Sequence, residues 1–224
     1  MSASASVLFD VPGPRARLRN NVLTLLTVAG LLGVAYFVYA KFAEKDQWNP
    51  RLWRHFLEVK TWTDFILPGL LHTLLAAVLG SVLALLFGAV FGLARLSDHR
   101  WIRIPAGAVV EFFRAIPLLL LIFFLFFLAP SVFGSGDHTL FALVAGLTLY
   151  NGSVLAEVVR AGVLAVPKGQ AEAAYAIGLR KTGVLWLILM PQAITAMMPA
   201  IVSQLVVLLK DTALGYIIAY QDLL

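Results

Sequence analysis

The stretch VPKGQAEAAYAIGLRKTGVLWLILMP, from Val166 to Pro191, decides how the rest of the sequence is interpreted. It lies between two apolar runs, each long enough to cross a lipid bilayer. Its central part, Gln170–Leu179, is rich in helix-forming alanine and contains Gly178. The stretch is too polar to cross lipid, yet one of its sides is apolar. It therefore predicts a short helix on the aqueous side of the membrane that docks against another protein.

The composition is that of a membrane protein. Of the 224 residues, 61% are hydrophobic and 13% are charged, compared with about half and about a quarter in a soluble domain. The net charge of +5 does not indicate a nucleic-acid partner, because the basic residues gather in short loops beside apolar runs, where they set membrane topology. There are no cysteines and the four histidines are scattered, so no metal site is expected.

The N-terminal part of the chain predicts one crossing that starts inside the cell. Residues 1–20 are expected to form a cytoplasmic tail, because Arg15, Arg17 and Arg19 precede the first apolar run. The uncharged residues 21–40 would span roughly 30 Å as a helix. The region 41–63 contains three tryptophans, which favour the bilayer surface. Residues 21–63 are therefore expected to form the first transmembrane helix and an external connector.

Residues 64–224 predict a bundle of four further transmembrane helices. The fold class is therefore all-α, a polytopic bundle with five spans present and the start of a further one at residue 212, whose remainder is expected to be missing. The expected spans after the first are 64–96, 104–129, 138–162 and 192–209. The tail and inner loops, including a long loop over 163–190, carry ten basic residues, whereas the outer segments carry six over a longer stretch.

Small residues in one span predict close packing between helices. Gly80, Gly88 and Gly92 lie eight and four residues apart, so they share one side of a helix. Glycines at such spacing let two membrane helices approach closely. We expect this face to pack against another helix rather than to contact a ligand.

The charged side chains inside the expected spans can be interpreted in two ways, as ion pairs within helices or as the lining of a translocation path. Glu111 and Arg114 lie three residues apart, and Glu157 and Arg160 repeat that spacing, which predicts two ion pairs within single helices. Alternatively, Arg114 lines a translocation path, because its planar guanidinium suits a carboxylate. The further polar residues considered for this path, or for contacts between helices, are Asn151, Ser203 and Gln204.

The docking stretch resembles the EAA signature of permease subunits of ATP-binding-cassette (ABC) importers. The matching residues are Glu172, Ala173, Ala174 and Gly178, and the closing Met190–Pro191 differs from the usual end only in its methionine. The polar amino acid subfamily is resembled by further stretches starting at His72, Glu111, Tyr150 and Leu208, and the opening residues resemble glutamate-type permeases. The resemblance covers most of residues 64–224.

The resemblance implies a type I importer in a bacterial cell membrane, and the basic tail predicts that the N-terminus of this multi-pass chain lies in the cytoplasm. Its partners would be ABC ATPase subunits that use ATP and magnesium, a second permease that is a different paralogue, an extracellular solute-binding protein and an amino acid substrate. The EAA helix would sit in a groove of the ATPase. The expected coupling residues are Gly169, Gln170, Glu172, Ala173, Ala174, Gly178 and Leu179.

The expected function is transport of a polar amino acid, most specifically L-glutamate, without catalysis by this chain. The sequence has no GxxxxGK[ST] phosphate-binding loop, so we expect no bound cofactor and no catalytic residue. A nucleotide-independent secondary transporter or channel is the alternative. It would need ion-binding carboxylates near the bilayer centre, whereas Glu111 and Glu157 lie towards the inner side. A membrane-embedded enzyme is a third possibility without a matching side-chain cluster.

Overall fold

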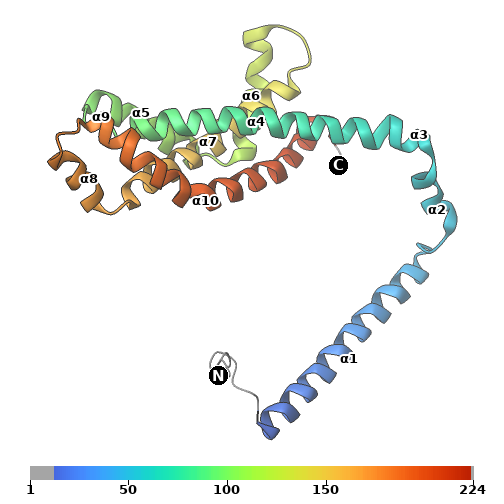
Figure 1. The fold of residues 1–224 in the computed structure, drawn as a ribbon. Coiled ribbons are helices and arrows are strands. Elements are labelled where there is room, and N and C mark those ends of the chain that lie inside the picture. Colours follow the sequence, from blue (N-terminus) through green and yellow to red (C-terminus); the bar gives the residue numbers. More distant parts are fainter. Residues whose placement is uncertain (1–12, 223–224) are drawn as a thin grey trace. The chain divides into compact units, whose positions relative to one another are not determined.

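The computed structural model describes residues 13–222, and their contacts divide the chain into two units, Met1–Thr61 and Trp62–Leu224. Each unit is described by itself. Within residues 13–222 every regular element is a helix, which confirms the predicted all-α class (Figure 1). Most of the expected N-terminal tail, residues 1–12, lies outside the described residues, as do residues 223–224 at the end of the segment expected to begin a further span.

The first unit contains one long apolar helix followed by a short helical connector. α1 runs over Pro14–Glu44, and none of its 31 residues is buried within the structure. At 1.5 Å per residue it is about 46 Å long, more than one bilayer core requires. The helix begins earlier than residue 21 because Pro14 suits the first helical turn after Gly13.

The connector is held by tryptophans and a helix cap. The Trp48 ring packs at a tilt against Tyr39 and Phe42, and its Nε1 donates to the Tyr39 carbonyl at 3.3 Å. The side chain of Asn49 caps the next helix by accepting from the Arg51 N–H at 3.1 Å. The connector's helices are α2 (Pro50–Arg54), η1 (His55–Leu57) and α3 (Val59–Thr61).

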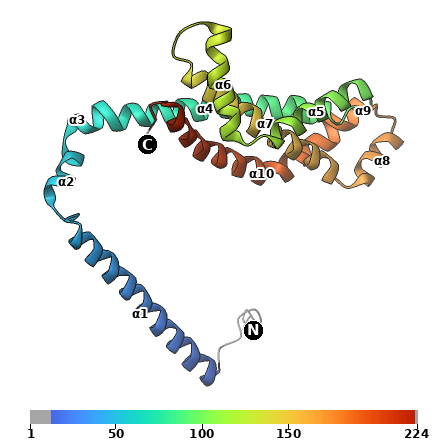
Figure 2. The ribbon, with the colours of Figure 1, turned by 180° about the vertical axis from the view of Figure 1, so that it is seen from behind.

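The second unit is a bundle of long helices. η2 (Trp62–Ile66) leads into α4 (Leu67–Ala94). In Figures 1 and 2, α4 lies lengthwise beside α5 (Arg100–Ala115), α7 (Thr139–Ala165) and α10 (Met190–Asp211). Within residues 13–222, the helical runs that are long and apolar enough to cross a membrane are Pro14–Glu44, Val59–Ala94, Thr139–Ala165 and Lys181–Ile218. The bent pair of helices α5 and α6 (Leu118–Phe133) forms a fifth span when the two are counted together as one crossing. The total then agrees with the five predicted spans.

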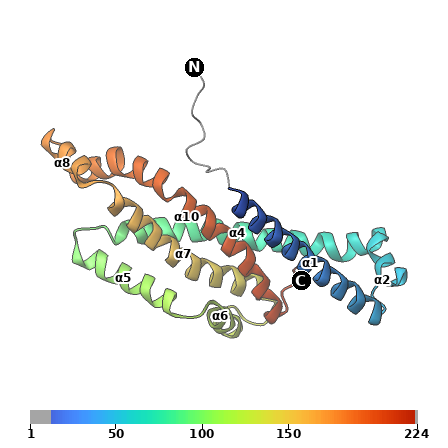
Figure 3. The same cartoon turned by 90° about the horizontal axis from the view of Figure 1, so that it is seen from below.

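The third expected span is broken rather than continuous. α5 (Arg100–Ala115) and α6 (Leu118–Phe133) meet at an angle of 100°, so that α6 is seen nearly end-on in Figure 3. Pro117 has no N–H to continue the helix and forces Ile116 into the extended region (ψ 129°). α6 still packs on α7 (Thr139–Ala165), where a Cβ at Gly146 would lie 2.6 Å from Ile122 Cγ1.

Close packing of α4 on α7 forms the centre of the bundle, as the glycine spacing predicted. Gly80, Gly88 and Gly92 are all buried on the side of α4 that faces α7. A Cβ at Gly88 would lie 2.6 Å from Leu155 Cβ, and one at Gly92 would lie 2.8 Å from the Ala156 carbonyl oxygen. These approaches leave no room for a side chain.

After α7 the chain makes a short excursion and returns in a long helical run. α8 (Lys168–Ala176) is followed by α9 (Lys181–Gly183), the π-helical η3 (Val184–Leu189) and α10 (Met190–Asp211). The last span thus starts at Lys181, about ten residues earlier than expected, which leaves a shorter inner excursion than 163–190. The segment expected to begin a further span is the 3₁₀ helix η4 (Thr212–Ile218), which continues α10 and ends at Ala219 in the left-handed region (φ 59°).

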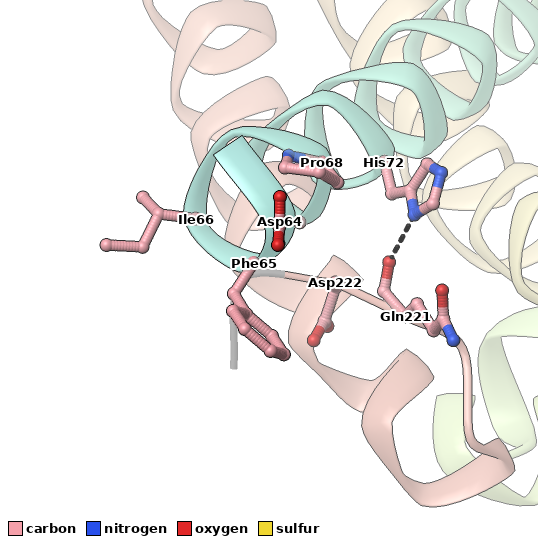
Figure 4. Close-up of a pocket in the computed structure, with 8 residues that line it drawn as sticks. Asp64, Phe65, Ile66, Pro68, His72, Gln221 and Asp222 are labelled. Atoms are coloured by element: carbon pink, nitrogen blue, oxygen red, sulfur yellow. Dashed lines mark hydrogen bonds between the residues drawn. The ribbon is translucent and has the colours of Figure 1, made fainter. Parts of the chain in front are cut away.

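At the end of the bundle opposite α8, the last described residues fold back onto α4. Tyr220 is buried, and its hydroxyl donates to the His72 carbonyl at 3.0 Å. His72 Nδ1 lies 2.8 Å from the Gln221 carbonyl oxygen, so Nδ1 must carry the proton. Figure 4 draws this hydrogen bond as a dashed line. His72 and Gln221 line a pocket of about 390 Å³ together with Asp64 and Asp222. None of the predicted site residues lines this pocket.

Candidate functional site

The predicted docking helix is present as α8, and local sequence explains both of its ends. Val166 is extended because Pro167 follows it, which ends α7. At the other end Gly178 adopts φ 83°, a left-handed conformation that glycine reaches without strain. The Gly178 N–H donates to the Tyr175 carbonyl at 2.9 Å, and the Leu179 N–H donates to the Ala174 carbonyl at 3.1 Å.

These two hydrogen bonds form a Schellman motif, which gives the EAA signature a physical reason. Ala174 provides the carbonyl that closes the motif, and the left-handed residue must then come four positions later, at Gly178. Leu179 is partly buried and Ala174 is 4% exposed, which suits the apolar pair that usually accompanies this cap. The signature therefore encodes a helix of fixed length with a sharp end.

The exposed face of α8 differs in part from the expected one. Ala174 was among the expected coupling residues, but it is buried because α8 packs back on η3. Lys168 and Tyr175 are also exposed, and five further exposed residues follow a helical spacing of three or four and form one face, which we call the α8 face: Gly169, Glu172, Ala173, Ala176 and Ile177. Gln170 is also exposed, but its Oε1 lies 3.5 Å from Gln192 Nε2 of α10.

Four of the predicted path residues lie together, and Arg95, which was not among the predicted site residues, joins them. Glu157 accepts from Arg160 at 2.8 Å and from Arg95 at 2.7 Å, and Arg114 approaches it to 3.8 Å. Arg95 also reaches Glu111 at 3.5 Å. These five residues, from the end of α4, from α5 and from α7, are called the arginine cluster below.

The arginine cluster confirms one expected ion pair and contradicts the other. Glu157 and Arg160 pair within α7 as predicted. Glu111 and Arg114 do not pair in the described structure, because Glu111 faces Arg95 and Arg114 faces α7. Arg95 is the member that sequence reasoning missed: it lies just beyond an apolar run, where a topology charge would also lie, yet its side chain is only 12% exposed.

The remaining predicted path residues lie elsewhere on α7 and α10. Gln204 Nε2 donates to Asn151 Oδ1 at 2.6 Å, and Asn151 is fully buried near the middle of α7. The Asn151 amide N–H group faces Asp211 without a well-formed hydrogen bond. Ser203 is exposed and does not join this pair. Asn151 and Glu157 are six residues apart, about 9 Å along the helix axis, so the polar pair and the arginine cluster are separate.

A further ion pair links the loop after α4 to the segment after α8. Lys181 bonds to Asp98 and lies 3.5 Å from the Leu96 carbonyl oxygen. The hydrogen bond from Lys181 holds the pKa of the Asp98 carboxyl below its ordinary value. Because the pKa of Asp98 is lowered, its contact with Lys181 contributes stability at pH values above the ordinary carboxyl pKa. This contribution is lost as the pH falls through the lowered pKa of Asp98. Arg95 of the arginine cluster lies only three residues before Asp98, so the cluster lies near the α8 end of the bundle.

Comparison with known proteins agrees with this architecture. Residues 84–223 match the family described as binding-protein-dependent transport system inner membrane component. The glutamate transport system permease protein GluD of Corynebacterium glutamicum is 46% identical over 176 residues, which cover 78% of this chain and 64% of GluD. This chain thus aligns with less than two thirds of that relative.

Other relatives and solved structures give the same placement. The probable glutamine ABC transporter permease protein GlnP of Bacillus subtilis is 39% identical over 71% of this chain and 73% of its own length. A crystal structure of an amino acid ABC transporter with histidines matches with a TM-score of 0.67 and 30% identity, over 75% of this chain and 78% of that chain. The MetNI methionine ABC transporter, at 23% identity and a TM-score of 0.57, supports the fold alone. The chain therefore belongs to the family of inner membrane components of binding-protein-dependent transport systems, as the EAA stretch predicted.

Proposed function

We propose that this chain is the permease subunit of an ATP-driven importer for polar amino acids, with L-glutamate as the substrate. The observation that carries the proposal is the α8 face: a rigid nine-residue helix at one end of the bundle, closed by Gly178, in a chain of this transporter family. Its small exposed side chains suit a groove, and Glu172 supplies one charge for a basic partner residue. ATP hydrolysis belongs to the partner ATPase, which holds ATP and magnesium.

The remaining partners and the orientation follow from the same proposal. A second permease of different sequence would complete the path, and an extracellular solute-binding protein would deliver the amino acid. The arginines at the start of α1 support a cytoplasmic N-terminus, and α8 would then lie on the cytoplasmic side as well. Residues 1–20, 21–63 and 64–224 would be the tail, the first crossing with its connector, and the permease domain.

The translocation path is proposed to run past the arginine cluster and the Asn151–Gln204 pair. Charges in a membrane helix usually face a bundle interior or a wet cavity. Arg114 is the cluster member with the weakest contact, 3.8 Å from Glu157, and its side chain is 42% exposed, so its guanidinium is available to a substrate carboxylate. Ser203 would add an exposed hydroxyl on α10. A nucleotide-independent transporter is not favoured, because the Glu157 carboxylate is already engaged by arginines.

Glutamate is favoured by GluD but not by every relative. GlnP of Bacillus subtilis is named for glutamine, and a relative from the same organism, ArtQ, for arginine. Uptake of radiolabelled L-glutamate should fall to background in cells lacking this gene and return with the intact gene. Competition with unlabelled aspartate, glutamine and arginine then ranks the substrates. Unchanged glutamate uptake with lost glutamine or arginine uptake would contradict the substrate, and unchanged uptake of all four would contradict the transport function.

The α8 cap gives a sharper test of coupling. Gly178→Val puts a β-branched residue at φ 83°, a strain of about 1–3 kcal/mol that unravels the end of α8. We expect the purified importer to lose most of its substrate-stimulated ATP hydrolysis. The melting temperature of the bundle should stay within about 2 °C of that of the unchanged protein. Gly178→Asn, which tolerates the left-handed conformation, should retain most of the activity.

Gly183→Ala is the matched control, because Gly183 has an ordinary helical conformation and a new Cβ there would make only van der Waals contact at 3.7 Å with Leu179. It should hydrolyse ATP and transport as the unchanged protein does. Equal activity of Gly178→Val and Gly183→Ala would show that the cap is not needed for coupling.

A further inference from the structure

α5 exposes large apolar side chains directly beside arginines. Trp101 is 89% exposed and Ile104 is 63% exposed, while Arg100 and Arg103 lie on the same two turns. Trp101, Ile104, Arg100 and Pro105 line a mainly apolar pocket of about 380 Å³. An exposed tryptophan next to basic residues at the end of a membrane bundle is typical of the bilayer–water interface.

A second pocket, of about 390 Å³, lies on the neighbouring side of α5 and shares Ile104 with the first. Its charged lining is predominantly basic, with Arg95 and Arg160 from the arginine cluster, Arg103, and Glu111. Between these side chains Gly107 has no heavy atom within 4 Å of a built Cβ, so the wall there is open.

The charges of this second pocket are not balanced by the protein. Arg95 and Arg160 share the carboxylate of Glu157, and Glu111 meets Arg95 only at 3.5 Å. The Arg103 guanidinium makes no hydrogen bond or salt bridge within residues 13–222, and the carboxylate that feels its charge, Asp98, is paired with Lys181. The pocket therefore has an excess of positive charge and one arginine with its donors free.

We infer that these two adjoining pockets bind one anionic phospholipid of the membrane. The headgroup phosphate accepts from Arg103 and from the free donors of Arg95 and Arg160, and an acyl chain lies along Ile104 and Trp101. Guanidinium groups match phosphate oxygens in geometry as well as charge. Basic pockets between membrane helices are a known setting for acidic lipid headgroups.

A phospholipid fits both pockets better than a free anion does. A soluble phosphate would satisfy Arg103 but would leave Trp101 and the apolar pocket uncovered. A neutral phospholipid would cover Trp101 but would leave the excess positive charge of the basic pocket unbalanced. The inference rests on the membrane placement in the proposed function, but it does not depend on the substrate or on coupling to ATP.

Lipid retention by the intact chain tests this inference. The full-length protein is purified from nanodiscs that contain equal amounts of phosphatidylglycerol and phosphatidylcholine, and bound lipid is counted by native mass spectrometry. We expect phosphatidylglycerol to be retained in preference to phosphatidylcholine. Arg103→Gln should lower its retention about five-fold, the effect of one surface arginine on an acidic lipid. Trp101→Ala should also lower it, and Arg103→Lys should keep most of it.

Arg54→Gln is the charge-matched control, because Arg54 lies in the connector of the first unit, and it should not change lipid retention. Thermal melting of each variant shows whether the bundle is intact. Equal retention of both lipids, or unchanged phosphatidylglycerol retention in Arg103→Gln, would overturn the inference. Displacement of the lipid by millimolar glycerol phosphate would also overturn it, in favour of a site for a free anion. Because no nucleotide or substrate is present, a failure here is distinct from a failure of the transport proposal.

Discussion

Gly88→Leu is expected to open the bundle between α4 and α7 and to abolish uptake. A Cβ at this position would lie 2.6 Å from Leu155 Cβ and 3.2 Å from the Ala156 backbone nitrogen, so neither a rotamer change nor a small side-chain shift makes room. Overpacking of this kind costs about 3 kcal/mol or more. Membrane helices have no hydrophobic drive to associate, so the lost close contact is not replaced by burial elsewhere. The measurement is the melting temperature of the detergent-purified protein, together with uptake in cells.

Gly33→Leu provides the matched control for this prediction. Gly33 lies on α1, and a Cβ there would meet no heavy atom within 4 Å. Gly33→Leu, measured in the same detergent, should leave the melting temperature equal to that of the unchanged protein or slightly higher, because leucine forms helices better than glycine does. If Gly88→Leu melts with the unchanged protein, α4 and α7 do not make the close contact described here.

The sequence was a good guide where one physical requirement dominates. Gly88 and Gly92 recur at a helical spacing in an apolar run, and close helix packing is the simplest reason for that pattern. Gly178 follows a helix-forming stretch, and its position agrees with a helix end. Both features depend on local backbone geometry, which a sequence pattern can carry.

The sequence was a poor guide where the partner comes from a distant part of the chain. The i, i+3 spacing of Glu111 and Arg114 permits an ion pair, but α7 presents Glu157 to Arg114 and α4 presents Arg95 to Glu111. A proline such as Pro117 is compatible with a helix bend of any size, whereas the 100° break depends on how α5 and α6 each pack on α7. Ala174 is apolar like its exposed neighbours, and only the return of η3 against α8 decides that it is buried.

Glu157→Gln is expected to destabilise the bundle and stop transport, because Glu157 is the residue that three arginines share. The change keeps the size of the side chain but removes the charge that faces Arg95 at 2.7 Å and Arg160 at 2.8 Å. Breaking a buried ion pair costs about 3–5 kcal/mol. The Glu157 side chain is 27% exposed, so solvent screening lowers our expectation to about 2 kcal/mol. A fall of roughly 5 °C in melting temperature would correspond to this loss.

Glu111→Gln makes the same chemical change within the same cluster and serves as its control. The Glu111 side chain is 72% exposed and has one contact, at 3.5 Å, so its substitution should cost less than about 1 kcal/mol. The double variant Glu157→Gln with Arg95→Met should recover part of the loss, because it removes the buried charge that the single variant leaves unpaired. Equal melting temperatures for Glu157→Gln and Glu111→Gln would contradict the central position of Glu157 in the arginine cluster. Recovered stability without recovered uptake would assign Arg95 to the transport cycle as well as to the fold.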